Sequence, residues 1–180
     1  TSRWEGYSTP NIFDPNSIRN FNSLPLEGET DTTRKGWSGD YWANSKGGIN
    51  LRWNSERPVG FNYPSPTLEQ AKNMSLEELS KLAPSEKWDI FTGNYDYPLK
   101  AYVANRVRPD ALLWEGICHG WAPAAIHHNE PTPKVLVGAN GIQVPFGSSD
   151  IKALLSFYYA RFHKDVKSRQ MGRRCEFGDG

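Results

Sequence analysis

The sequence predicts an α+β fold in one domain of 180 residues. Two features predict it. Apolar residues recur with helical spacing in several segments after Thr67, and residues 134–146 show the pattern of a β-hairpin. No internal repeat is visible. We therefore expect a loop-rich start over residues 1–66, a core of helices and β structure over 67–165, and an exposed tail over 166–180.

The composition argues against several classes of protein. The chain holds 21 basic and 20 acidic residues, a net charge of +1, which points to neither nucleic acid nor an anionic membrane as a partner. No apolar run reaches the roughly 18 residues that a membrane-spanning helix needs. Aromatic residues make up 13% of the chain and the mean hydropathy is −0.67, a composition common in secreted proteins. Because the chain begins with Thr1, we expect either a product processed from a precursor or a shortened chain, and the composition favours a secreted, periplasmic or extracellular location.

Residues 36–54, GWSGDYWANSKGGINLRWN, are expected to form aromatic-rich strands and turns. Gly47 and Gly48 suit a tight connection, after which apolar residues alternate as in a strand. The alternating residues are Ile49, Leu51 and Trp53. The tryptophans of this segment could line a groove for sugar or peptide, but large rings more often pack in a core, and we favour the core. These tryptophans are Trp37, Trp42 and Trp53.

Two helices are predicted from their end signals. Ser75 with Glu78 three residues later forms a capping box at the start of SLEELSKLA, and Pro84 closes that helix. Pro84 also suits the first position of the next helix, PSEKWDIF, which Gly93 ends.

The clearest β signal is KVLVGANGIQVPF, residues 134–146. Two Val- and Ile-rich runs flank GANG, whose Asn140-Gly141 step favours a hairpin turn. We expect one alternating row to face the core, namely Val135, Val137, Ile142 and Val144. A helix should follow, with SSD as its cap and a buried stripe at helical spacing. The stripe comprises Ile151, Leu154, Leu155, Tyr158 and Phe162.

Cys118 is the candidate reactive residue. The segment CHGWAPAAIHHNEP is Ala-rich, and Pro123 is tolerated only in the first turn of a helix, so the helix should begin near His119 or Gly120. This places Cys118 at the N-terminal tip, where unpaired N–H groups and the helix dipole stabilise a thiolate. The alternative is a small buried thiol with no chemical role. Small residues around Cys118 would let substrate and backbone come close; they are Gly116, Gly120, Ala122 and Ala124.

A thiol nucleophile also needs a base, and the sequence offers no convincing one. His119 adjoins Cys118 but should point elsewhere, while His127 and His128 lie about 14 Å along the same helix by axial rise. His163 is expected to be a half-exposed residue near the end of its own helix. The spacing of Cys118 and these histidines matches no zinc motif, so we expect no metal site there.

Four segments together resemble the transglutaminase elicitor family, secreted enzymes of oomycete pathogens with relatives in bacteria. They occur in order between about residues 24 and 160: GWSGDYWANSKGGINLRWN, LAPSEKWDIFTGNYDYPL, WEGICHGWAPAA and SSDIKALLSFYY. The resemblance implies a papain-like cysteine-enzyme fold, with residues 1–180 as a single catalytic domain and Cys118 as the attacking thiol. It also implies a catalytic His with an Asp or Asn partner on C-terminal strands.

None of the four histidines of this chain matches that base. We therefore expect a separate or missing C-terminal β part, supplied by a second chain from the same precursor. Cys175 lies in the Arg-rich stretch SRQMGRRCEFGDG and could tether that chain by a disulfide in an oxidising compartment. The competing interpretation is a shortened chain in which Cys175 is a free thiol on a frayed tail.

The implied reaction is acyl transfer between proteins. The Cys118 thiolate would attack the γ-carboxamide of a protein-bound glutamine, and a lysine amine would resolve the thioester into an isopeptide cross-link. The N–H of Cys118 would bind the oxyanion. Trp121 is expected in the core, Trp114 could wall the acyl tunnel or pack inside, and solvation is the default for Glu115. No cofactor is required, with calcium left open.

Two other functions stay open at this point. A papain-like peptidase or amidase would use the same thiol, because only the pocket decides between amine and water as the acceptor. A non-catalytic module could instead bind glycan or peptide through the tryptophan-rich first half of the chain.

Overall fold

The computed structural model describes residues 18, 20–28, 36–53 and 63–163, which fall into two units. In the first unit, residues 18 and 20–28 are exposed and include one short 3₁₀ helix, η2 (Phe21–Ser23), whose backbone Asn20 caps through its side chain. The second unit holds the remaining described residues and carries the candidate site. The predicted tail of residues 166–180, with Cys175, lies outside the described residues.

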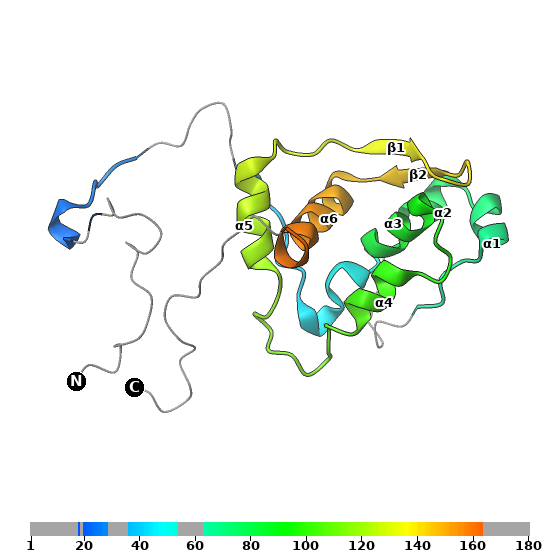
Figure 1. The fold of residues 1–180 in the computed structure, drawn as a ribbon, viewed down its shortest axis with the longest axis horizontal. Coiled ribbons are helices and arrows are strands. Elements are labelled where there is room, and N and C mark those ends of the chain that lie inside the picture. The colour runs from blue at the N-terminus through cyan, green and yellow to red at the C-terminus, as the bar shows by residue number, and fades with distance from the viewer. Residues whose placement is uncertain (1–17, 19, 29–35, 54–62, 164–180) are drawn as a thin grey trace. The chain divides into compact units, whose positions relative to one another are not determined.

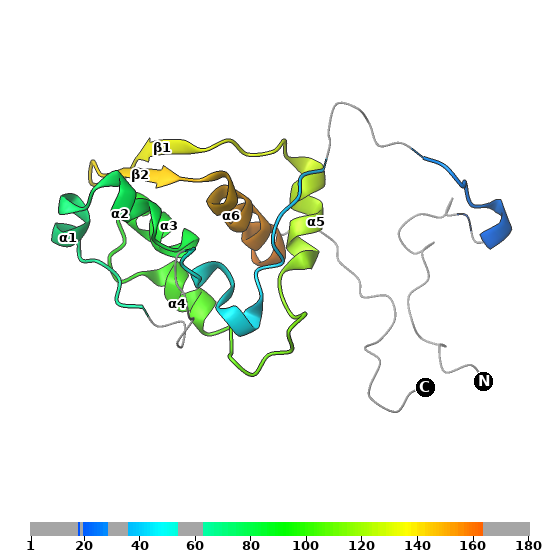
Figure 2. The same ribbon diagram turned by 180° about the vertical axis from the view of Figure 1, so that it is seen from behind.

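The second unit combines short helices with one hairpin, so the α+β class is confirmed (Figures 1 and 2). α6 lies between α5 on one side and the α3 and hairpin side of the unit on the other. In chain order the elements are η3 (Asn44–Lys46), η4 (Gly48–Asn50), α1 (Leu68–Asn73), α2 (Leu76–Ser80), α3 (Pro84–Thr92), α4 (Pro98–Ala104), α5 (Cys118–His127), β1 (Lys134–Val137), β2 (Gln143–Phe146) and α6 (Ser148–Arg161).

The ends of α2 and α3 test the predicted signals. Ser75 caps α2 by accepting from the Glu78 N–H, and the Glu78 carboxylate accepts from the Ser75 N–H in return. Pro84 is the first residue of α3, and Gly93 ends that helix in a left-handed conformation with φ 78°. The predicted start of α2 and both predicted ends of α3 are confirmed, because each signal acts within one turn of chain. α2 itself ends at Ser80, so the prediction that Pro84 closes it is wrong.

The strands expected within residues 36–54 are absent from the described part of that segment, which holds η3 and η4 instead. Gly47 and Gly48 do form a tight connection, with φ values of 96° and 56°. Two successive left-handed residues curl the chain, so the following N–H groups of Asn50 and Leu51 bond back to Gly47 and Gly48 rather than to a neighbouring strand. The alternation of apolar residues here was therefore misleading.

The hairpin is confirmed, but one of its strands faces solvent. β1 pairs antiparallel with β2, with Leu136 opposite Val144, and Gly141 turns the chain with φ 76°. Ile142 and Val144 are buried as predicted. Val135 and Val137 are 52% and 65% exposed, so their predicted place in the core is wrong. The core packs against β2 and leaves β1 as an outer strand.

Three clusters of apolar side chains form the core. One joins α1, α2, α3 and Tyr97 with β2, a second joins η4, α4 and α6 through Ile49, Val103 and Phe157, and a third joins Trp37 to α5. Trp37 and Trp42 are each 4% exposed, which confirms the core interpretation for these two rings, whereas Trp53 is 42% exposed. Core packing therefore begins well before residue 67.

The buried face of α6 differs from the predicted stripe. Ala153, Ser156 and Phe157 are buried, while Tyr158 and Phe162 are 48% and 45% exposed. The other predicted residues, Ile151, Leu154 and Leu155, are half-buried. The helix turns its smaller residues toward α5, since a closely packed partner helix leaves little room. Ile151, Leu154 and Leu155 pack against the core clusters, so only Tyr158 and Phe162 of the predicted stripe are exposed.

A buried ionic cluster fixes the 3₁₀ segment against the helices. Glu86 of α3 accepts from Arg52 at 2.7 and 2.8 Å and forms an ion pair with Lys100 of α4 at 2.9 Å. Burial raises the pKa of the Glu86 carboxyl, but the bonds from Arg52, Lys100 and Ser65 outweigh it, so the pKa lies below its usual value. The paired charges thus hold Arg52, α3 and α4 together.

Candidate functional site

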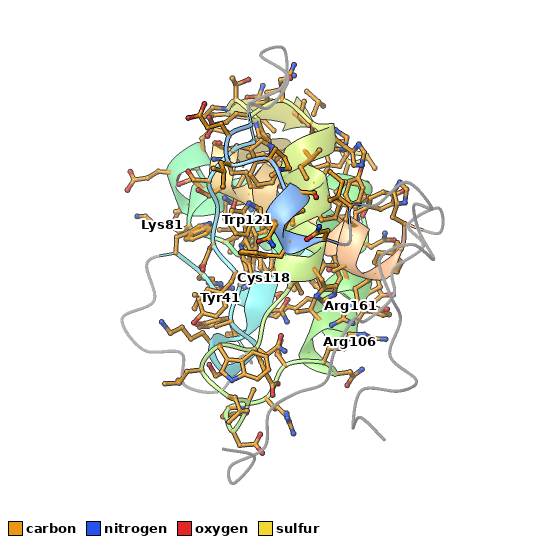
Figure 3. All side chains as sticks on the ribbon, turned by 90° about the vertical axis from the view of Figure 1, so that its left-hand side faces the viewer. Tyr41, Lys81, Arg106, Cys118, Trp121 and Arg161 are labelled. Carbon is orange, nitrogen blue, oxygen red and sulfur yellow. The ribbon has the colours of Figure 1, made fainter. Side chains whose placement is uncertain are left out.

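Cys118 is the first residue of α5, and its side chain is exposed (Figure 3). This confirms its predicted place at the helix tip. Within the described residues, the backbone N–H groups of Cys118 and His119 have no hydrogen-bond acceptor, while those of Gly120 and Trp121 both bond to the carbonyl of Ile117. The thiol therefore lies beside two free donors at the positive end of a ten-residue helix.

The glycines around Cys118 are required by packing. A Cβ on Gly116 would lie 2.1 Å from the carbonyl oxygen of Tyr41, which accepts the N–H of Ile117 next to it. A Cβ on Gly120 would lie 2.1 Å from the carbonyl oxygen of Ser156 on α6. Both contacts are with backbone, so they leave a side chain no room. The sequence predicted a close approach of substrate or backbone at these glycines, and here it is neighbouring backbone that approaches. The backbone of Tyr41 and that of Ser156 hold the tip of α5 from two sides.

Pro123 corrects the expected register of the helix. The sequence placed it in the first turn, but α5 begins at Cys118, so Pro123 lies inside the helix beyond that turn. Proline has no N–H, so the helix loses one internal hydrogen bond at this point. Of the small residues expected around Cys118, Gly120 and Ala124 are buried and Ala122 is exposed.

The residues flanking the thiol have different environments. Trp121 packs against two core clusters, and its indole N–H donates to the carbonyl of Trp37 at 3.3 Å, as the core interpretation predicted. Trp114 is 62% exposed, so it is not a core residue within the described structure. The Glu115 side chain is only 17% exposed and lies 3.7 Å from Arg108, so the expectation of a solvated carboxylate is wrong. The backbone of Glu115 explains its position, because its carbonyl accepts from Asn44.

His119 is directed to α6. Its ring makes a hydrogen bond with the backbone of Ala160. Partial burial and the nearby Arg161 cation lower the pKa of His119, and the Ala160 bond opposes them without reversing the shift. The lowered pKa favours the neutral form of His119, and its bond to Ala160 directs the ring to α6.

The other three histidines gather around Tyr159 of α6. The rings of His127 and His163 both stack with Tyr159, at centroid distances of 6.0 and 4.6 Å. Nε2 of His128 lies 3.1 Å from the Tyr159 hydroxyl. The structure thus brings these histidines to one tyrosine, and His163 is half-buried at the end of α6 as predicted. Among the described residues no histidine forms a hydrogen bond with the Cys118 thiol.

Metal binding finds no support in the described ranges, where no three His, Cys, Asp or Glu side chains converge as ligands. The calcium alternative stays a prediction. No described helix is long and apolar enough to cross a bilayer.

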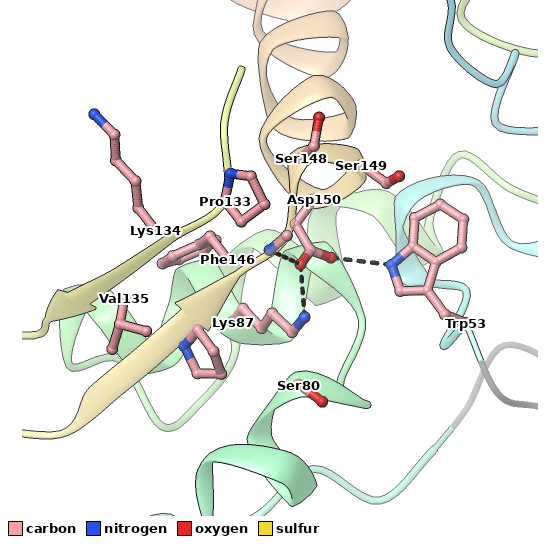
Figure 4. Close-up of a pocket in the computed structure, with 12 residues that line it drawn as sticks. Trp53, Ser80, Lys87, Pro133, Lys134, Val135, Phe146, Ser148, Ser149 and Asp150 are labelled. Atoms are coloured by element: carbon pink, nitrogen blue, oxygen red, sulfur yellow. Dashed lines mark hydrogen bonds and ion pairs between the residues drawn. The ribbon is translucent and has the colours of Figure 1, made fainter. Parts of the chain in front are cut away.

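A cavity of about 450 Å³ at the start of α6 holds a buried ion pair (Figure 4). The Lys87 ammonium lies 2.7 Å from the Asp150 carboxylate, which also accepts from Trp53 at 3.0 Å and from the Gly147 N–H at 2.7 Å. These bonds satisfy the buried carboxylate and cap α6, which explains the pair structurally. The sequence pattern missed this pair because Lys87 and Asp150 lie far apart in the chain.

The arrangement at Cys118 supports nucleophilic chemistry in part. An exposed thiol beside two free backbone N–H groups has the geometry for attack on a carbonyl carbon and for binding the resulting oxyanion. The described residues provide no base in contact with the thiol.

Two comparisons with known proteins give matches that include the segment around Cys118. A search of curated protein sequences finds no match. A solved structure, the GP42 transglutaminase from Phytophthora sojae, is similar with 21% identity and a TM-score of 0.50, over 77% of this chain and 42% of that one. This chain thus spans less than half of that structure, and the likeness shows the fold. The sequence profile of the transglutaminase elicitor family matches residues 111–170, so the part of this chain with α5, the hairpin and α6 is similar to the family that its motifs predicted.

Proposed function

We propose that this chain is the cysteine-bearing part of a secreted transglutaminase. The observation that carries the proposal is the exposed Cys118 at the first residue of α5, inside the segment that matches the transglutaminase elicitor family. A buried structural thiol would lie in one of the apolar clusters, and Cys118 belongs to none of them.

The reaction is acyl transfer in two steps. The Cys118 thiolate attacks the γ-carboxamide carbon of a protein-bound glutamine, a carbon–sulfur bond forms, and the C–N bond breaks after a proton reaches the leaving nitrogen, which departs as ammonia. A lysine amine then attacks the thioester carbon, loses a proton to the base, and releases the thiolate with an isopeptide bond in place. The free N–H groups of Cys118 and His119 hold the oxyanion in both steps.

The base comes from a second polypeptide of the same precursor. It supplies a His with an Asp or Asn partner and completes a papain-like fold around the thiol, and Cys175 tethers it by a disulfide. Two facts support this proposal: His127, His128 and His163 make their ring contacts with Tyr159, and more than half of the similar transglutaminase has no counterpart in this chain.

The test uses the protein as it is secreted, with any polypeptide that remains bound to it. A glutamine-bearing peptide and a labelled primary amine are supplied, and mass spectrometry records amine incorporation and ammonia release. We expect Cys118-dependent incorporation, with Cys118→Ala inactive and equal to wild type in melting temperature. Hydrolysis without incorporation would favour the amidase alternative. If Cys118→Ala kept full activity, the thiol would have no catalytic role.

A further inference from the structure

An apolar groove of about 640 Å³ lies away from Cys118, between α3, β1 and α6. Large side chains line it, including Trp88 and Phe91 of α3, Leu136 of β1, and Leu155, Tyr158 and Phe162 of α6. Trp88, Leu136, Tyr158 and Phe162 are between 39% and 48% exposed. Contiguous apolar surface of this kind marks an interaction site when no part of the protein covers it, and no described residue does.

The α6 side of the groove has the sequence pattern of a buried face. Ile151, Leu154, Leu155, Tyr158 and Phe162 repeat at helical spacing, and all of them line the groove. The face of α6 toward α5 is already packed, since Gly120 lies against its backbone and Ala153 is buried. At the groove, Ile151, Leu154 and Leu155 are only half-buried against the core clusters, and Tyr158 and Phe162 are exposed. A helix that is apolar on two sides needs a second layer.

The β1 side points to a polypeptide as the missing layer. In the described structure β1 pairs with β2 alone, so its outer edge offers unpaired N–H and C=O groups. Val135, Leu136 and Val137 are all exposed, so both faces of β1 are uncovered as well. An exposed, aliphatic edge strand is a template for another strand. Only a polypeptide satisfies the edge and also fills the apolar groove.

We propose that this surface, β1 with the groove between α3 and α6, docks an extended apolar segment of the polypeptide that completes the transglutaminase fold. The inference rests on the proposed function, and it names the surface through which the two polypeptides join. The segment adds a strand to β1 and places aliphatic or aromatic side chains against Tyr158 and Phe162.

The size of the similar structure favours this occupant over a second copy. This chain covers 42% of that structure, so more than half of that structure has no counterpart in this chain, and we infer that part of the missing portion covers the groove. Most of the residues that line the groove lie in the segment that matches the family, whereas Trp88, Phe91 and Leu99 precede it. Lys134 and Glu130 at the groove carry opposite charges, so we expect association to depend little on salt.

The test measures hydrogen exchange of the β1 amides (Lys134–Val137) in the 180-residue chain alone and co-expressed with the polypeptide that its gene encodes beyond residue 180. We expect rapid exchange in the monomeric chain and strong protection in the complex. Tyr158→Glu and Leu136→Lys should each weaken the complex by about 30-fold or more, the loss typical of a central interface residue. Both side chains are partly exposed, so each variant should keep the melting temperature of the isolated chain.

Ile126→Lys is the matched control, because Ile126 is 63% exposed on α5 and does not line the groove. It should bind like wild type. Protection of β1 in the isolated chain would overturn the proposal, whether the chain itself, a second copy or a small apolar ligand covers the surface. So would a complex that leaves β1 unprotected, or a gene without such a polypeptide. A protected complex without amine incorporation would contradict the proposed function and leave the docking surface intact.

Discussion

Replacing Gly120 with Ala should destabilise the protein although alanine favours helices. The added Cβ would lie 2.1 Å from the carbonyl oxygen of Ser156, 2.6 Å from the Cβ of Ala160 and 2.7 Å from its backbone nitrogen. None of these atoms belongs to the flexible end of a side chain. α5 and α6 would therefore have to move apart by about 1 Å to restore van der Waals contact.

Two opposing effects set the size of the change. Gly to Ala in a helix gains about 1 kcal/mol, whereas overpacking typically costs about 1–3 kcal/mol and more against rigid backbone. We expect overpacking to prevail, with a net loss of about 2 kcal/mol in the free energy of unfolding. For a chain of this size that corresponds to a melting temperature lower by about 4–8 °C.

Differential scanning calorimetry of the purified chain measures this shift. Gly36→Ala is the matched control, because its Cβ would meet only the carbonyl of Ala125 at 3.9 Å, an ordinary contact. That variant should stay within about 0.5 kcal/mol of wild type. A Gly120→Ala protein as stable as wild type would show that α5 and α6 are not packed closely beneath Cys118.

Iodoacetamide at mildly acidic pH should alkylate Cys118 faster than Cys175, because Cys118 is exposed at the tip of α5. Peptide mapping measures the two alkylation rates. Protection of Cys118 until the protein is denatured would contradict the prediction. Gly141→Val should lower the free energy of unfolding in urea by about 1 kcal/mol or more, because φ at Gly141 is 76°. The surroundings of Gly141 are open, so only backbone strain contributes. An unchanged urea midpoint would mean that the turn tolerates a β-branched residue. Burial raises the pKa of Asp89 to about 6, against backbone hydrogen bonds from the start of α4. The folded protein then holds this proton more tightly than the unfolded chain does, so the stability contribution of Asp89 should be lost as the pH rises from about 4 to 6. The urea unfolding midpoint of the Asp89→Asn variant should lack that decline.

Local signals in the sequence were sufficient to locate most helix ends. Ser75, Pro84 and Gly93 act on groups within one turn of chain, so their effect does not depend on the rest of the fold. The tip position of Cys118 was predictable for the same reason. The hairpin turn at Gly141 also follows from local backbone preference.

Burial was less predictable, because it depends on segments that are distant in sequence. Val137 has the same β pattern as Val144, but only β2 packs against the helices. Ile49 alternates with its neighbours as in a strand, yet the two preceding glycines curl the chain. The pairing of Lys87 with Asp150 and the contact of His128 with Tyr159 leave no trace in sequence spacing.

The glycine contacts around Cys118 have a consequence for biosynthesis. Gly116 rests on Tyr41, which is made early, while Gly120 rests on Ser156 and Ala160, which are made last among the described helices. A ribosome-bound chain that has synthesised Cys118 still lacks the second of these supports. The tip of α5 therefore reaches its final position only after α6 has left the ribosome and folded.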